Sequence, residues 1–114
     1  MLDISFSHVF NCEIAKFHGI ESALILYYLS RNINFNEEIK DKSFIIDDKY
    51  WCDFSYEGLF SYLEDLVSEK AIRRSIEDLK NSGILEITGE TNAPFLTVMK
   101  CSVNEDKLKE SVMI

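Results

Sequence analysis

The clearest structural pattern in this sequence is SEKAIRRSIEDLKNSGIL, residues 68–85. Ser68 is a typical N-cap residue and Gly83 a typical stop, so the residues between them predict a helix over Glu69–Ser82. The side chains that recur at helical spacing and predict its buried face are Ala71, Ile72, Ser75, Ile76 and Leu79.

The segments on both sides of this helix predict a second helix and a hairpin. Ser55 is expected to cap a short preceding helix with Leu59, Phe60 and Leu63 on one face, so that residues 55–82 form a helix-turn-helix. Residues 84–103 predict two strands joined by a turn at 89–94. Helix, short turn, helix and hairpin is the order of elements in a winged helix.

The N-terminal half predicts a helical part over residues 13–33. Its apolar residues recur at three- and four-residue steps, with a break at Gly19 and more than one buried side. The amide side chains of residues 32–36 are expected to end it, and Glu37–Lys42 is expected to be a connector, either a loop or a short helix.

Two smaller elements complete the expected fold. β-branched and aromatic residues around the polar corner Asp47-Asp48-Lys49 predict a hairpin over 43–52. The tail, residues 104–114, contains a short helix that Leu108 and Val112 can dock onto the domain. The fold class is therefore α+β, mostly α: a winged helix-turn-helix with N-terminal helices and a C-terminal β-hairpin wing.

Length and composition indicate one folded domain over residues 1–114. The chain is 46% hydrophobic, with four Gly and one Pro, which excludes disorder for most of it. The longest apolar run, Ala23–Leu29, is much shorter than the roughly 20 residues of a membrane span. Because the N-terminus has no pattern of a secretory signal, we expect a cytoplasmic protein.

Net charge is the most informative bulk property. Twelve basic and 20 acidic residues give a net charge of −8, which disfavours a simple basic nucleic-acid-binding domain. The three cysteines, Cys12, Cys52 and Cys101, lie far apart among apolar or aromatic residues. They are expected to be buried, reduced thiols in a reducing compartment.

Several of these segments resemble the winged helix-turn-helix domain of phage and prophage replication proteins. The resemblance rests on Tyr50-Trp51, on Ser55-Tyr56-Glu57, on the run from Leu66 to Ile76, and on the exit Gly83-Ile84-Leu85. It implies that the helix 69–82 enters the major groove of DNA. The contact residues so implied are Lys70, Arg73, Arg74 and Asn81. An equally good interpretation of the two arginines is ion pairing with Glu69, Glu77 or Asp78 along the helix.

Two features depart from that family. The expected wing, residues 88–94, holds Glu90 and neither Lys nor Arg, although phosphate contacts by cations drive sequence-independent DNA binding. The replication proteins also usually carry a further domain or a long tail, so the chain is expected to be a stand-alone winged helix or a truncated relative.

No pattern of catalytic or metal-binding residues was found. His8 and His18 do not stand in a metal-ligand spacing with Cys12, and neither a phosphate-binding glycine loop nor a nucleophile signature is present. We therefore expect no enzyme, metal or cofactor. The pairs Glu64-Asp65 and Glu77-Asp78 are expected on solvated helix faces, and Trp51 and the tyrosines in the core rather than on a base-stacking platform.

The first hypothesis is a phage-type protein that binds another protein through an acidic surface. Between Glu37 and Glu57 there are seven acidic residues against three lysines. Such a surface can occupy the basic nucleic-acid groove of a host defence complex, as an anti-CRISPR-like inhibitor would, in the host bacterial cytoplasm. The candidate residues are Glu37, Glu38, Asp41, Asp47 and Asp48.

The second hypothesis keeps the function that the resemblance implies. The chain would be a DNA-binding module in phage or plasmid replication initiation or in transcription, and a homodimer would give it more cationic surface. Its candidate contacts are those of the helix 69–82. The sequence leaves open the partner, the oligomeric state and which of the two faces makes the contact.

Overall fold

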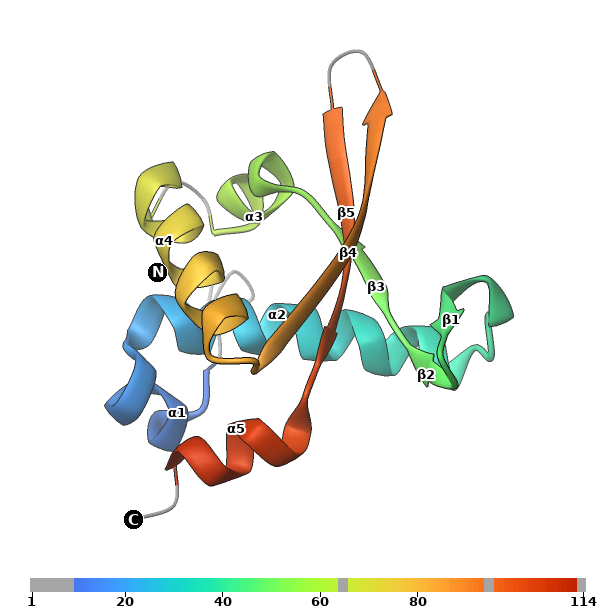
Figure 1. Ribbon diagram of the computed structural model, residues 1–114. Coiled ribbons are helices and arrows are strands. Elements are labelled where there is room, and N and C mark those ends of the chain that lie inside the picture. The colour runs from blue at the N-terminus through green and yellow to red at the C-terminus, as the bar shows by residue number, and fades with distance from the viewer. Residues whose placement is uncertain (1–9, 64–65, 94–95, 113–114) are drawn as a thin grey trace, which may run out of the picture.

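In the computed structural model, which describes residues 10–63, 66–93 and 96–112, five α-helices are combined with two small antiparallel sheets (Figure 1). The helices are α1 (Cys12–His18), α2 (Ile20–Glu38), α3 (Tyr56–Tyr62), α4 (Glu69–Asn81) and α5 (Glu105–Val112). The strands are β1 (Ile45–Ile46), β2 (Lys49–Tyr50), β3 (Cys52–Phe54), β4 (Leu85–Ala93) and β5 (Leu96–Val103), with the 3-10 turn η2 (Lys42–Phe44) before β1. The predicted α+β, mostly helical class is confirmed.

Side-chain caps set the starts of α3 and α4. Ser55 Oγ accepts a hydrogen bond from the Gly58 amide at 3.0 Å, and Ser68 Oγ accepts one from the Ala71 amide at 3.1 Å. α4 ends at Asn81, one residue before the predicted end, and Gly83 follows with φ of +78°. Both helices predicted within residues 55–82 are confirmed.

The prediction that the N-terminal helix ends at residues 32–36 is wrong. Gly19 does divide it, but α2 continues through these asparagines to Glu38. The reason is tertiary: Asn36 is buried, and its Nδ2 donates a hydrogen bond to the carbonyl of Trp51 at 2.9 Å. An amide that favours turns in isolation is thus held in a helix, and Glu37 and Glu38 belong to that helix rather than to a connector.

The small hairpin is shorter than predicted. β1 and β2 pair around Asp47 and Asp48, whose φ angles of 51° and 63° match the left-handed turn that joins such short strands. Cys52 is not part of this hairpin. It begins β3, which pairs with β5 and was not predicted as a separate strand.

The second hairpin, β4–β5, extends well beyond the other elements (Figure 1). The turn predicted at 89–94 is wrong, because β4 runs through to Ala93. The ladder has an irregularity between Thr88 and Thr91, and Gly89 lies there with φ of +69°. Pro94, at the end of the predicted turn, lies outside the described residues.

The three-stranded sheet has the order β3–β5–β4, and the core lies between it and the helices. α2 and α4 pack on each other, and α2 also contacts β3 and β5. The largest fully buried aliphatic side chains are Ile25, Leu26, Leu29, Leu59, Leu63, Ile72, Ile76, Leu79, Ile84 and Leu85. These include Ile72, Ile76 and Leu79 of the face predicted for α4; Ser75 of that face is also buried, and Ala71 is half-buried.

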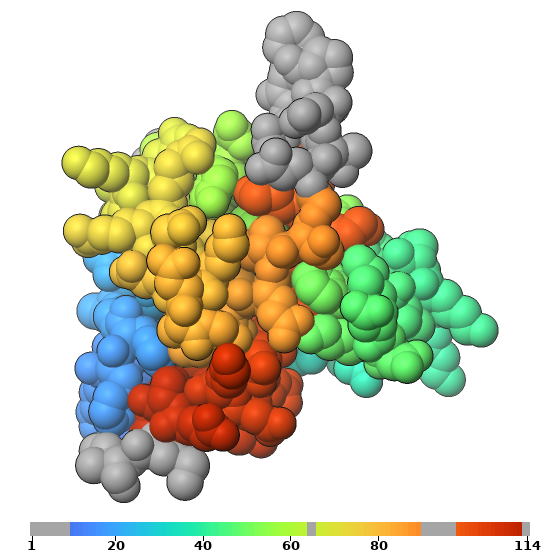
Figure 2. All heavy atoms as spheres, viewed as in Figure 1, coloured from blue at the N-terminus to red at the C-terminus, as the bar shows by residue number. Residues whose placement is uncertain are grey.

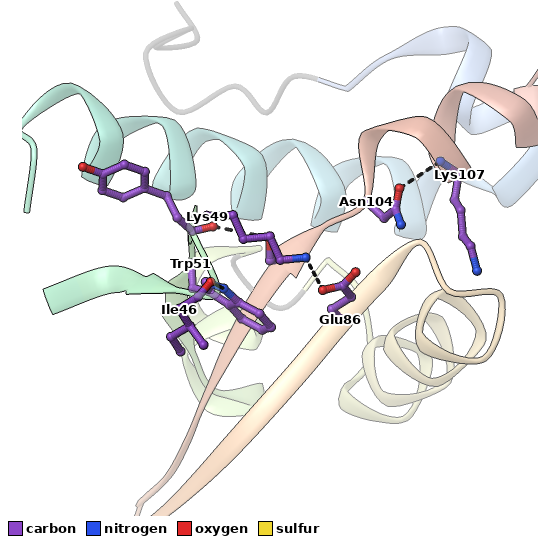
Figure 3. A network of polar contacts seen from close by, with 8 residues as sticks. Ile46, Lys49, Trp51, Glu86, Asn104 and Lys107 are labelled. Carbon is purple, nitrogen blue, oxygen red and sulfur yellow. Dashed lines mark hydrogen bonds and ion pairs between the residues drawn. The ribbon is translucent and has the colours of Figure 1, made fainter. Parts of the chain in front are cut away.

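Polar contacts attach the peripheral elements to this core (Figure 3). Lys49 pairs with Glu86 across to β4, and the indole Nε1 of Trp51 donates to the carbonyl of Ile46 at 3.1 Å. Asn104 Oδ1 accepts from the Lys107 amide at 3.1 Å and so caps α5. The predicted docking of α5 is confirmed for Leu108, which packs against the core, while Val112 is half-buried.

Candidate functional site

The outward face of α4 carries the predicted DNA-contacting residues. Lys70, Arg73, Arg74 and Asn81 are all exposed, because the opposite face of the helix is buried in the core. Figure 2 shows α4 (yellow to orange) at the surface, with long side chains projecting from it. Lys70 and Arg74 have no acidic partner among the described residues, so their charges face solvent.

Arg73 is held more firmly than its neighbours. Its Nη2 lies 3.0 Å from Glu69 Oε1, which confirms one of the ion pairs expected along the helix. Its guanidinium carbon lies 4.2 Å from the centroid of the Tyr56 ring, at the start of α3. This cation–π contact and the ion pair fix the guanidinium in one orientation.

A groove of about 550 Å³ separates α4 and the start of α3 from the β4–β5 hairpin. Its charged lining residues are Arg73, Lys80, Glu57 and Glu77, and the backbone at Gly89 forms part of its edge. Lys80 lies within the predicted helix 69–82 but is not among the contact residues that the sequence indicated. It follows Arg73 by two helical turns, a spacing that places both on one side of α4 and could have indicated it.

Lys49 and Lys100 on the sheets differ from Lys70, Arg74 and Lys80 on α4 because they form ion pairs within the chain. Lys100 pairs with Asp53 at 3.5 Å and lies 5.2 Å from the centroid of the Phe44 ring. Lys49 pairs with Glu86 and lies 5.3 Å from the Trp51 ring. Lys70, Arg74 and Lys80 on α4 therefore keep available positive charge, as do the exposed Lys107 and Lys109 of α5, which have no ion-pair partner among the described residues.

The predicted acidic residues come together at the other end of the molecule, around the end of α2, η2 and the β1–β2 hairpin (Figures 1 and 2). We call Glu37, Glu38, Asp41, Asp47 and Asp48 the acidic end. All but Asp41 are exposed, and Asp41 is half-buried. Hydrogen bonds from the Ser43 hydroxyl (2.6 Å) and amide (3.1 Å) lower the pKa of Asp41, so this carboxylate is engaged locally.

Large apolar side chains accompany the acidic end, and the sequence interpretation missed them. Phe35 is 58% exposed, Ile39 53% and Ile45 38%. Tyr27, on the same outward side of α2 as Phe35, is 39% exposed and so contradicts the expectation that the tyrosines pack in the core. Trp51 does lie in the core, at 5% exposure. The signal was available in the spacing of Tyr27 and Phe35, two turns apart.

The remaining candidates for chemistry have structural surroundings. Cys52 and Cys101 are buried with their sulfurs 3.6 Å apart, and this hydrogen bond together with burial raises the pKa of Cys101. Cys12 is exposed, so its predicted burial is wrong. His18 Nε2 lies 2.8 Å from Ser111 Oγ, which links α1 to α5.

Within residues 10–63, 66–93 and 96–112, no cluster of three or more His, Cys, Asp or Glu side chains is arranged to hold a metal ion. Glu77 and Asp78 are exposed on α4, and Pro94, His8 and the pair Glu64-Asp65 lie outside these ranges. None of the described helices combines the length and apolar character needed to cross a bilayer.

The comparisons with known proteins give no match. No protein-family model, no curated protein and no solved structure is significantly similar to this chain. The support for a function therefore comes from the residues and their arrangement.

Proposed function

We propose that this chain is a non-enzymatic, winged-helix module that binds duplex DNA through the outward face of α4. The observation that carries the proposal is the separation of charge: Lys70, Arg74 and Lys80 stand on α4 without acidic partners among the described residues, whereas the acidic end lies at the opposite end of the molecule (Figure 2). The net charge of −8 is thus not evenly spread, which weakens the main argument against DNA binding.

The order of the elements supports the winged-helix assignment. α2, β3, α3, α4 and the β4–β5 hairpin occur in this order along the chain, with η2 and the β1–β2 hairpin inserted between α2 and β3, and β5 lies between β3 and β4 in the sheet. In a winged helix the second helix of the helix-turn-helix enters the major groove while the hairpin lies beside it. α4 holds that place here, with its polar face outward.

The α4 face offers two kinds of contact. Lys70 and Arg74 are suited to phosphate oxygens, which position a protein on the duplex. Arg73, oriented by Tyr56, and Asn81 have the forked or amide donors that bind base edges in the major groove. Binding of Arg73 to a base edge would replace its exposed Glu69 partner, a pair of small energetic value.

The small number of cations limits the expected affinity. The four basic residues of α4 allow at most four phosphate contacts from this helix, so the slope of log K against log salt is expected to be about −3.6 or shallower. Acidic residues in the groove, Glu57 and Glu77, oppose a closer approach of the backbone. Binding should therefore be clear at low salt and weak at physiological salt.

The test is a fluorescence titration of duplex DNA at several salt concentrations. Replacing Lys70 and Arg74 together with alanine is expected to weaken binding about tenfold or more and to make the salt slope shallower by about two. Lys40→Ala with Lys42→Ala is the matched control, because these two exposed lysines lie near the acidic end. Equal losses in both double variants would reject α4 as the DNA contact.

A second function, binding of a basic protein partner through the acidic end, is favoured by one specific observation. Glu37, Glu38, Asp47 and Asp48 are exposed beside Phe35 and Ile39, and charge with apolar area is typical of protein interfaces. An anti-CRISPR-like inhibitor would present such an acidic surface to a basic nucleic-acid groove, where its carboxylates would take the place of the nucleic-acid phosphates. If the folded chain binds no DNA even at low salt, this function gains support, and a partner captured by the chain should be lost when these four residues are changed to lysine.

A further inference from the structure

The outward side of α2 has an unusual composition for a largely exposed helix face. We call Tyr27, Arg31, Phe35 and Glu38 the outer stripe; these residues follow one another at steps of about one turn, opposite the buried side that holds Leu26 and Leu29. They line a shallow groove of about 570 Å³ along the helix. A stripe that mixes exposed aromatic rings with charges is characteristic of a protein interface.

From this stripe we infer that two copies of the chain associate through antiparallel α2 helices about a twofold axis. The outer stripe is self-complementary. A twofold axis at Asn34 and Phe35 places Arg31 of one copy opposite Glu38 of the other, and Glu38 of the first copy opposite Arg31 of the second. The same register sets the two Phe35 rings near each other, whereas the position opposite Tyr27 is residue 42, beyond the end of the second copy's α2. Arg31, Phe35 and Glu38 thereby each gain a partner across the axis.

The end of α2 supplies an independent reason for the same register. Glu37 and Glu38 occupy its last turn, which contains no basic residue. Negative charges there interact unfavourably with the negative end of the helix dipole. A cation near the last carbonyls would offset this repulsion. Arg31 of a second copy is that cation, and neither Arg31 nor Glu38 has an ion-pair partner among the described residues.

The association leaves α4 and the β4–β5 hairpin uncovered, since the outer stripe belongs to neither. A dimer would carry two α4 faces and would double the cations available to one duplex. Dimer formation does not depend on DNA binding, however, because the residues that support it all belong to α2. A failure to dimerise can therefore be told apart from a failure to bind DNA.

The test is sedimentation equilibrium of the full chain from about 1 μM to about 1 mM. We expect a monomer–dimer equilibrium that weakens about tenfold or more with either Arg31→Glu or Glu38→Arg, since each reversal acts twice across the axis. The double variant carrying both changes should return to within about threefold of the original dissociation constant. Lys16→Glu and Glu110→Arg, exposed on α1 and α5, are the matched controls and should leave it unchanged.

Three results would overturn the inference. One is a chain that stays monomeric across the whole concentration range. Another is a dimer whose dissociation constant changes with neither Arg31→Glu nor Glu38→Arg. The third is a loss of dimerisation in the single variants that the double variant does not restore. Phe35→Ser gives a check that does not involve charge: it should remove the dimer while the far-ultraviolet circular dichroism spectrum stays the same, because this ring is 58% exposed. Retention of the dimer in Phe35→Ser would also contradict the register.

Discussion

α4 and α2 are the two helices that pack on each other in the core, and they differ on their outward faces. α4 is polar on every outward position, with Lys70, Arg74 and Asn81 facing solvent. α2 keeps Tyr27 and Phe35 exposed on the side away from the core. The difference indicates two kinds of partner: α4 suits a hydrated, charged surface such as DNA, whereas α2 suits the surface of another protein chain.

The buried faces of both helices should matter more for stability than either outward face. Leu79 of α4 is fully buried, so Leu79→Ala is expected to lower the free energy of unfolding by about 2–5 kcal/mol. Urea denaturation followed by circular dichroism measures this. Leu66→Ala is the control, because that side chain is 72% exposed and should change stability by no more than about 0.5 kcal/mol. Similar losses in both variants would place Leu79 outside the core.

Asn36 tests how the outward end of α2 is held to the sheet. Asn36→Ala leaves the Trp51 carbonyl without its 2.9 Å partner and is expected to cost about 1–3 kcal/mol of unfolding free energy. The neighbouring Asn34 is exposed, and Asn34→Ala should be within about 0.5 kcal/mol of the original chain. If both changes are neutral in urea denaturation, the buried hydrogen bond does not hold α2 in place.

Removing the N-cap of α4 should lower stability less than the two changes above, because it removes one hydrogen bond at the start of that helix. Ser68→Ala removes the acceptor for the Ala71 amide and is expected to lower the free energy of unfolding by about 1 kcal/mol. Ser61 is an exposed hydroxyl within α3, so Ser61→Ala is a suitable control and should be neutral or slightly stabilising. Thermal denaturation of the two variants side by side measures the difference.

Glu69 should affect binding in the opposite direction to the cations of α4. Glu69→Gln removes the negative charge of the 3.0 Å partner of Arg73 but keeps a side-chain oxygen that accepts a hydrogen bond, and it is expected to cost no more than about 1 kcal/mol of stability. It should strengthen DNA binding about twofold to fivefold at low salt, because one negative charge leaves the face. Glu105→Gln, on α5, is the charge-matched control, and weaker DNA binding by Glu69→Gln would contradict the proposed contact face.

The sequence predicted α4 well because its local and tertiary signals agree: Ser68 caps it, Gly83 follows it, and its apolar residues lie on one side. The predicted end of α2 was wrong because the local and tertiary signals conflict there. Asn36 favours a turn by propensity, but its buried hydrogen bond to Trp51 extends the helix, which no short-range pattern contains. Similarly, β3 is too short to stand out without its partner β5.

The candidate site divides in the same way. The residues of the α4 face could be named from the helical period and the resemblance to phage replication proteins. The stacking of Arg73 on Tyr56 and the engagement of Lys49 and Lys100 within the chain depend on contacts between distant segments. The helical period places Tyr27 and Phe35 on one side of α2, but the exposure of that side depends on how far α2 projects past the core, which only the three-dimensional arrangement determines.

DNA binding by the α4 face is the central claim, and a salt-dependent titration of duplex DNA tests it most directly. We predict clear binding at low salt, with a slope of log K against log salt of about −3.6 or shallower. This slope should lie about two units closer to zero in the Lys70→Ala, Arg74→Ala variant and should be unchanged in Lys40→Ala, Lys42→Ala. Absence of binding by the folded chain at low salt, or binding that does not respond to the α4 substitutions, would contradict it.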